Sequence, residues 1–299
     1  MNGGREESGS EIFHRNMNFE RITPNAAHRN IGLSERESVH LNEDLISAAY
    51  HGNFRKAEEL LNNNASATYH SAKRQHVTAL CMAASKNHTQ TMQLLLDRGA
   101  DINAMTSNGY DAVYFAAVSF ESDALRLLLR NKPVLKQYVS YGHPVSLLME
   151  IFSILQPHSG LEMDHRKLDV IKILLQERFP VNGCVHKHSY QHSGGVCPDG
   201  ILSPLIQVVK SNFGRISLEF KLELCDLLLT YKADIDEQDP HGNTALHHAV
   251  RVGCLRMVPH LLFKGANQNI LNYDGKTAQE LTTRNSETAL IFDQWESII

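Results

Sequence analysis

The chain has 299 residues, of which 42% are hydrophobic and 21% charged, and its formal net charge is −4. This composition is typical of a soluble folded protein, and the slightly acidic balance argues against binding to nucleic acid or to an anionic membrane surface. No apolar run approaches the roughly 18 residues that a transmembrane helix needs, and the first residues lack the apolar core of a secretory signal.

Residues 1 to about 40 are rich in Gly, Ser, Asn, Glu and Arg, with isolated apolar residues and no periodicity. Such a segment buries too little apolar surface to offset its ordering entropy, so we expect residues 1–40 to be disordered. A short docking peptide around Ile12 and Phe13, or around Phe19, is the functional alternative.

Three regular helix pairs follow, each with a capping residue, a short apolar-faced helix, a turn and a second helix. The expected pairs are Glu43–Ala49 with Phe54–Leu61, Thr78–Ala84 with Thr91–Leu96, and Asp111–Ala117 with Ala124–Leu129. Asn42, Thr78 and Asp111 are the expected N-caps, because their side-chain oxygens can accept orphan backbone N–H groups of the first turn. From cap to leucine pair, the offset is 17 residues in the second and third pairs (78 to 95 and 111 to 128).

The fourth and fifth pairs are irregular. The same offset is 28 residues from Ser146 to Leu174 and 25 residues from Ser203 to Leu228, which indicates insertions around residues 155–165 and 211–218. The connection between these pairs is also extended, at residues 185–199. Loops of this length inside a compact repeat array are typically functional or mobile.

The stretch Asp239–Asn272 has the most regular pattern. Thr244 caps a first helix, Gly253 breaks it, and a second helix ends before Gly265, which can adopt the left-handed conformation. A shorter pair with a final helix follows in residues 274–299. One such pair cannot bury its apolar face alone, so the pattern predicts stacked neighbours of the same shape.

The sequence Thr244-Ala245-Leu246-His247-His248-Ala249 resembles the T-P-L-H-x-A signature of ankyrin repeats, with alanine in place of proline. The pattern recurs with the ankyrin period of 33 residues, which separates Ala233 from Ala266 and Gly242 from Gly275. The resemblance implies an all-α fold, an ankyrin-repeat solenoid of stacked helix pairs with β-hairpin-like fingers. The implied repeats are approximately 41–72, 73–105, 106–138, 139–184, 185–238, 239–271 and 272–299.

The resemblance also implies which side chains contact a partner. They are the residue directly after the histidine of the T-P-L-H motif and the residues one helical turn later, and they face a concave groove. The candidates are Met82, Lys86, Phe115, Ser119, Glu150, Gln207, His248 and Arg251 on the first helices, with Tyr141 and His241 on the fingers. Further expected finger-tip residues are Gln75, Asn108, Asp239 and Tyr273. Phe115 is the candidate anchor, since an exposed aromatic side chain can contribute strongly to binding. Packing of its ring on adjacent repeats is the alternative.

For His247, the resemblance implies a structural role, with hydrogen bonds that hold the neighbouring hairpin. Asn103 and Asn269 occupy the finger position that asparaginyl hydroxylase modifies in some ankyrin proteins. Turn-stabilising hydrogen bonds are the alternative role of these two asparagines.

One cluster has the ligand types of a zinc site: Cys184, His186, His188, His192 and Cys197. Its spacing fits no standard zinc module, because it lacks a C-x₂-C half. A solvated polar loop is the alternative, and we assign no metal and no cofactor to the chain.

The sequence has no phosphate-binding loop, no H-E-x-x-H helix and no nucleophile elbow. We therefore expect no enzymatic activity, but a monomeric intracellular scaffold or adaptor that binds another protein, without nucleic-acid binding or membrane insertion. The five cysteines lack framework spacing, which favours reduced thiols and a cytoplasmic or nuclear location. One alternative is a substrate-recognition subunit of a ubiquitin ligase, although the last 25 residues carry no recognisable SOCS-type or F-box-like module. The other is a metal-binding sensor or enzyme that uses the Cys184–Cys197 loop.

Overall fold

The computed structural model describes residues 33–135, 138–140, 143–145, 147–154, 165–182, 203–210, 218–282 and 287–296. The chain divides into two compact units. The N-terminal unit comprises Met1–Val139 and His165–Ile173, and the C-terminal unit comprises Ser140–Asp164 and Leu174–Ile299.

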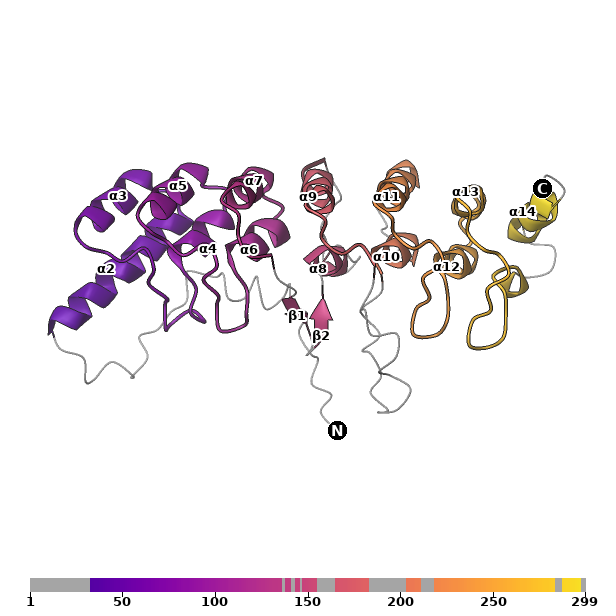
Figure 1. Cartoon of the computed structure of the whole chain (residues 1–299), viewed down its shortest axis with the longest axis horizontal. Coiled ribbons are helices and arrows are strands. Elements are labelled where there is room, and N and C mark those ends of the chain that lie inside the picture. Colours follow the sequence, from indigo (N-terminus) through magenta and orange to yellow (C-terminus); the bar gives the residue numbers. More distant parts are fainter. Residues whose placement is uncertain are drawn as a thin grey trace, which may run out of the picture. The chain divides into compact units, whose positions relative to one another are not determined.

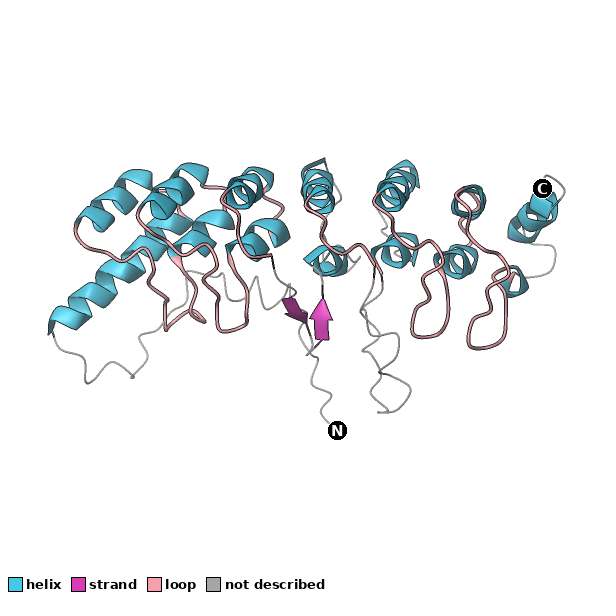
Figure 2. Ribbon diagram, in the orientation of Figure 1, coloured by secondary structure: helices cyan, strands magenta, loops and turns pink. Residues whose placement is uncertain are grey.

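In the N-terminal unit the helices stack in two rows (Figures 1 and 2). The first helices of the pairs are α2 (Leu33–Tyr50), α4 (Ala79–Ala84) and α6 (Ala112–Val118), and the second helices are α3 (Phe54–Asn62), α5 (Thr89–Asp97) and α7 (Ser122–Arg130). Helix α4 contacts both α2 and α6, and α5 contacts both α3 and α7. The segment His165–Ile173 of this unit belongs to α9 (His165–Gln176).

The sequence explains this stacking in two ways. Thr78 and Asp111 are N-caps of α4 and α6, and the side chain of each accepts a hydrogen bond from the backbone N–H three residues later. Each first helix also contributes a buried pair of alanines, at 48–49, 83–84 and 116–117. Side chains this small let neighbouring helices approach closely, and the apolar residues around them form a close-packed core.

The C-terminal unit repeats the arrangement. Its first helices are α8 (Leu147–Ile154), α10 (Pro204–Lys210) and α12 (Ala245–Val252), and its second helices include α11 (Leu218–Thr230) and α13 (Met257–Phe263), followed by η3 (Gln279–Leu281) and α14 (Glu287–Glu296). Helix α10 contacts α8 and α12, η3 contacts α12, and α14 contacts α13. Between α7 and α8 in chain order, strands β1 (Tyr138–Ser140) and β2 (His143–Val145) pair in a two-stranded sheet.

The expected helical solenoid with β-hairpin-like fingers is confirmed. The expected start of the first helix is wrong, because residues 33–40, where the composition favoured disorder, form the beginning of α2. Asn42 therefore lies inside α2 and is not its N-cap. Residues 1–32 lie outside the described residues, as do residues 155–164, 183–202 and 211–217, which contain most of the expected insertions. The approximate boundaries of the repeats remain predictions.

Candidate protein-binding surface

The fingers are the loops that lead into the first helices. They comprise residues 63–78 and 98–111 in the N-terminal unit, and residues 231–244 and 264–278 in the C-terminal unit. In each unit the tip of one finger is hydrogen-bonded to the tip of the one before it. The backbone N–H of Ser107 donates to the carbonyl oxygen of Gln75 (2.8 Å), and that of Tyr273 donates to the carbonyl oxygen of His241 (3.0 Å).

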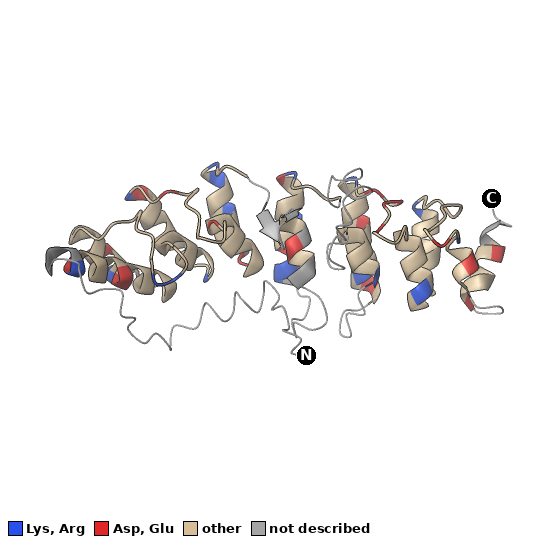
Figure 3. Ribbon diagram, turned by 90° about the horizontal axis from the view of Figure 1, so that it is seen from below, with Lys and Arg blue, Asp and Glu red and all other residues tan. Residues whose placement is uncertain are grey.

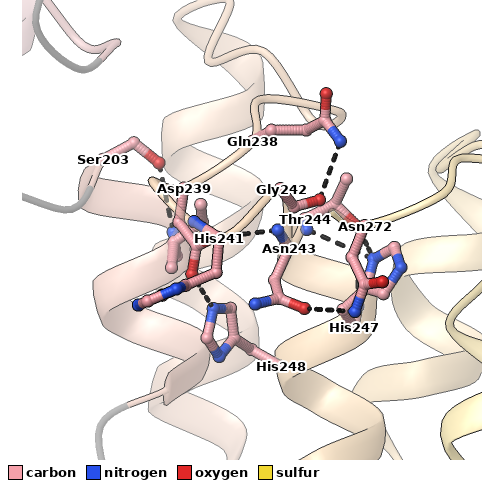
Figure 4. A network of polar contacts seen from close by, with 11 residues as sticks. Ser203, Gln238, Asp239, His241, Gly242, Asn243, Thr244, His247, His248 and Asn272 are labelled. Atoms are coloured by element: carbon pink, nitrogen blue, oxygen red, sulfur yellow. Dashed lines mark hydrogen bonds and ion pairs between the residues drawn. The ribbon is translucent and has the colours of Figure 1, made fainter. Parts of the chain in front are cut away.

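Asp239 holds the first finger of the C-terminal unit in shape (Figure 4). Its carboxylate accepts hydrogen bonds from the backbone N–H groups of His241 and Asn243 (both 2.8 Å) and contacts Nε2 of His248 at 2.8 Å. Burial by itself would raise the pKa of Asp239, but these three hydrogen bonds outweigh it and lower the pKa to about 2. The carboxylate is therefore ionised and pairs with a helix α12 side chain at neutral pH.

His247 connects the same finger to the next one. Its Nδ1 accepts a hydrogen bond from the backbone N–H of Thr244 (3.2 Å), which leaves the proton on Nε2. That nitrogen donates to the carbonyl oxygen of Lys276 (3.1 Å), and burial lowers the pKa of His247, so the ring is neutral. Nδ2 of Asn272 adds a second link, to Oδ1 of Asn243 (3.1 Å). His247 thus has the hairpin-holding role that the resemblance implied.

Five of the predicted contact residues are buried, so they cannot supply the exposed surface expected of them: Met82, Phe115, Glu150, Gln207 and His248. Phe115 packs edge-on against Tyr114 at 6.1 Å between ring centroids, so the alternative of packing within the array describes it correctly. The imidazole of His248 is engaged by Asp239. These buried side chains stabilise the stack of helices. The sequence pattern of one helix does not show that side chains of neighbouring repeats cover them.

The other candidates differ in exposure. Lys86, Arg251 and His241 are exposed and Ser119 is half-buried, whereas Tyr141 lies outside the described residues. The ammonium group of Lys86 lies 5.0 Å from the centroid of the Tyr50 ring. Positive and negative side chains occur together on the same helices, for example along α11, so charge alone does not mark a binding face (Figure 3).

On the described fingers of the C-terminal unit, the large exposed apolar side chains are Tyr273, which is 74% exposed, and Leu271, which is 54% exposed. Tyr273 was among the expected finger-tip residues, whereas Leu271 was missed. The available signal was alternation, since the buried Asn272 lies between them and successive residues of an extended finger point to opposite sides. Gly242 has a φ of +78°, and a Cβ atom there would lie 2.6 Å from Cδ1 of Tyr273, so only glycine lets the two tips approach.

The backbone N–H of Asn103 donates to Oδ1 of Asp101 (2.9 Å) within its turn, whereas the side chain of Asn103 reaches the chain after α7. Oδ1 of Asn103 accepts from the backbone N–H of Val134 (2.7 Å), and the backbone N–H of Asn269 donates to Oδ1 of Asn267 (3.0 Å). Hydroxylation of either asparagine remains a prediction.

The candidate metal ligands from Cys184 to Cys197 lie outside the described residues. Among the residues that the structure describes, no group of three or more His, Cys, Asp and Glu side chains could hold a metal ion. Cys81 and Cys225 are buried, and burial raises their thiol pKa to about 11 and about 12, so both are protonated at neutral pH. No described helix is both long and apolar enough to cross a bilayer.

Comparison with known proteins identifies relatives that match a large part of this chain. The human transient receptor potential cation channel subfamily A member 1 is 27% identical over 203 residues, which cover 64% of this chain and 18% of the channel. A putative ankyrin repeat protein of Acanthamoeba polyphaga mimivirus is 22% identical over 227 residues, which cover 73% of this chain and 29% of the viral protein. The chain therefore spans less than a third of the length of either relative.

Two solved structures share the fold. The human ASB11 ankyrin repeat domain has a TM-score of 0.58 at 18% identity, covering 84% of this chain and 96% of that domain. The ankyrin repeat domain of Bcl-3, a member of the IkappaB family, has a TM-score of 0.60 at 20% identity, covering 83% of this chain and 97% of that domain. A family model described as ankyrin repeats (3 copies) matches residues 45–137 and 215–291, more than half of the chain. The chain belongs to the ankyrin repeat family.

Proposed function

We propose that the chain is a non-enzymatic scaffold or adaptor that binds another protein, and that the finger tips of the C-terminal unit make the main contact. Ankyrin repeats generally mediate protein–protein interaction and are typically non-enzymatic. The observation that carries the proposal is the exposed pair Leu271 and Tyr273, on a finger fixed by hydrogen bonds to its neighbour.

Two physical reasons favour this surface. Tyrosine has a large contact area and few rotatable bonds, and it is enriched among the residues that dominate binding energy. The backbone hydrogen bond from Tyr273 to His241, together with the side chain of Gln238, which donates to the carbonyl oxygens of Gly242 (2.7 Å) and Leu271 (3.0 Å), fixes the tip before a partner arrives. A surface ordered in advance loses less conformational entropy on binding.

The remaining parts of the proposal come from the sequence. We infer a monomer that acts in the cytoplasm or the nucleus, with another protein as its partner and without binding to nucleic acid. The narrower role of a substrate-recognition subunit of a ubiquitin ligase remains an alternative within the same class. Lys86, Arg251 and the half-buried Ser119 remain candidate secondary contacts, because they are the described first-helix candidates that solvent reaches.

The test is affinity purification with quantitative mass spectrometry, comparing the wild-type chain with the double variant Leu271→Ser and Tyr273→Ser. Loss of an aromatic side chain that dominates binding costs about 2 kcal/mol or more, which corresponds to a roughly 30-fold weaker affinity. We therefore expect the double variant to lose the partner.

Phe263→Ser is the matched control, because Phe263 is 76% exposed but lies at the end of α13, away from the finger tips. The control should retain the partner. Equal recovery of all partners by the wild-type chain and the double variant would contradict the proposal, as would equal losses in the double variant and the control.

A further inference from the structure

A cavity of about 360 Å³ lies in the C-terminal unit, where the chain leaves α9 and α11. Leu175 and Phe179, both buried, contribute apolar surface to its lining, and the half-buried Tyr231 lies beside them. Arg178 and Lys232 also line it, and both are exposed. A volume of about 300 Å³ or more is typical of ligand-binding clefts, and the combination of an apolar lining with a few polar groups is typical of their walls.

The two cationic residues adopt a backbone conformation that usually requires glycine. Arg178 has a φ of +61° and Lys232 a φ of +66°, whereas the same position of the next repeat is Gly265, with a φ of +93°. The turn is the same in each, since the backbone N–H of Arg178 donates to Leu175 O (3.1 Å) and that of Lys232 donates to Leu229 O (2.9 Å). A residue with a Cβ atom is strained there, and Asn64 and Lys132 adopt the same conformation in the N-terminal unit, so the left-handed turn is a feature of the repeat.

A positive charge at the end of a helix interacts favourably with the helix dipole, which offsets part of this strain. Lys132 allows the effect of a cation at a helix end to be separated from the effect of a cation that lines the cavity. It occupies the same position after α7, with a φ of +53° and the same turn hydrogen bond to Leu129 O (3.0 Å), but it does not line the cavity.

The charges at the cavity are not neutralised by the described chain. Within the described residues, neither Arg178 nor Lys232 forms an ion pair. Two acidic residues lie close by in sequence: Glu177 precedes Arg178, and the acidic residue that follows Lys232 is Asp234. The backbone N–H of Asp234 donates to Oδ1 of Asn182 (2.8 Å), and its Oδ1 accepts from the backbone N–H of Asp236 (3.1 Å). Among the described residues, the cavity is therefore lined by apolar surface and by two cationic side chains without an ion-pair partner.

We propose that this cavity is a second interaction site, separate from the finger tips, that binds an acidic linear segment of a partner protein. An apolar side chain of the segment occupies the space beside Phe179 and Tyr231, and flanking carboxylates pair with Arg178 and Lys232. The guanidinium group of arginine can bind a carboxylate through two parallel hydrogen bonds, which gives the pairing a defined orientation. The charge complementarity also selects against basic segments.

The probe is a fluorescein-labelled peptide of sequence Gly-Glu-Glu-Phe-Glu-Glu-Gly, whose binding to the full chain is measured by fluorescence anisotropy at low salt. The test variant combines Arg178→Gly with Lys232→Gly. Glycine is the residue that suits the backbone at both positions, so the variant should fold, and its thermal unfolding confirms this independently. Losing two such ion pairs should weaken peptide binding about fivefold or more. Lys132→Gly is the matched control and should bind as the wild-type chain does.

Peptides with glutamine in place of glutamate, or with alanine in place of phenylalanine, should each bind more weakly than the probe. No binding of the probe to the wild-type chain overturns the proposal, as does unchanged binding to the double glycine variant. Displacement of the probe by inorganic phosphate alone would instead identify a site for small anions. If light scattering shows that the wild-type chain self-associates and the double variant does not, the occupant is a second copy of the chain. Displacement by phosphate and self-association would each overturn the proposal.

Discussion

The fingers of the two units share a backbone design. The turns at the tips contain the same backbone hydrogen bond, from Thr106 N to Tyr110 O (2.8 Å) in the N-terminal unit and from Asp239 N to Asn243 O (2.9 Å) in the C-terminal unit. The side chains that anchor the fingers are different. In the C-terminal unit, His247 reaches forward from α12 to the following finger.

In the N-terminal unit the corresponding signature position is Cys81, whose Sγ only receives a hydrogen bond from Thr78 (3.2 Å). The first finger of that unit, residues 63–78, is held from α2 by other side chains. Oδ1 of Asn42 accepts from the backbone N–H of Ser66 (2.6 Å), and Oε1 of Glu43 accepts from the hydroxyl groups of Ser71 (2.6 Å) and Tyr69 (3.2 Å). Backbone geometry therefore defines the finger, while different side chains can anchor it.

The tips also differ in what they present. The linked tips of the N-terminal unit are joined by polar side chains, since Nδ2 of Asn108 donates to Oε1 of Gln75 (2.8 Å), and the large exposed apolar side chain on these fingers is Met105, which is 40% exposed. The linked tips of the C-terminal unit present Leu271 and Tyr273. The backbone scaffold is the same in both units, so the difference lies in the side chains at the tips. Burial of apolar area is the dominant favourable contribution to most protein association, so burying Leu271 and Tyr273 against a partner should contribute more binding free energy.

The largest expected effect is at Asp239. Asp239→Asn removes a buried carboxylate that pairs with His248 and accepts two backbone hydrogen bonds, and breaking such a pair costs about 3 kcal/mol or more. Urea unfolding should show this loss. Asp274→Asn, at an exposed position of the next finger, should change the free energy of unfolding by less than about 0.5 kcal/mol. Similar effects of the two substitutions would rule out the anchoring role of Asp239.

The pH dependence of stability provides a second measure of the same carboxylate. Its pKa falls from 3.8 to about 2 on folding, so its contribution is fully present above pH 3.8 and is lost as the pH falls towards 2. The wild-type chain should therefore lose more stability than Asp239→Asn over this interval. Parallel unfolding curves for the two chains between pH 5 and 2 would show that the carboxylate is not stabilised by the fold.

Gly242 should be the next most sensitive position. Gly242→Ala introduces strain at a φ of +78° and brings a Cβ atom within 2.7 Å of the backbone nitrogen of Tyr273, so the two tips must separate. We expect a loss of about 3 kcal/mol. Gly253→Ala is the matched control, since its φ is +69° but no atom lies within 4 Å of the added Cβ, so only the strain of about 1–2 kcal/mol applies. Equal losses in thermal unfolding would refute the close approach of the tips.

His247→Ala should have a smaller effect, about 2 kcal/mol, because it leaves buried backbone groups of two fingers without partners. Hydrogen exchange should locate the change at residues 272–276. Cys81→Ala in the N-terminal unit should cost roughly 1 kcal/mol and leave exchange of the following finger, residues 98–111, unaltered, since the Cys81 thiol is hydrogen-bonded to Thr78 at the start of its own helix. Faster exchange of residues 98–111 in the cysteine variant would show that both units use the signature position in the same way.

Much of this fold is predictable from local chemistry. The period of 33 residues, the caps Thr78, Asp111 and Thr244, and the left-handed glycines Gly253 and Gly265 all lie where the sequence pattern indicates. The cause is that helix starts and stops depend on a few backbone groups and the side chains next to them.

The candidate site was less predictable. The burial of Phe115 and Gln207 depends on side chains from adjacent repeats, which no single repeat pattern contains. The start of α2 at Leu33 was missed because residues 33–40 have no apolar periodicity. Extending a helix that is already packed avoids the costly nucleation step, so polar residues can continue it.

The central claim is that the finger tips of the C-terminal unit, and not the equivalent tips of the N-terminal unit, contact the partner. Site-specific photo-crosslinking tests it most directly, with benzoylphenylalanine placed at Tyr273 in one chain and at Asn108 in another. Both positions are exposed finger tips linked to the preceding finger, so they differ mainly in the unit that bears them. The account predicts a covalent adduct with a partner protein from position 273 and none from position 108. An adduct from position 108 alone would contradict it.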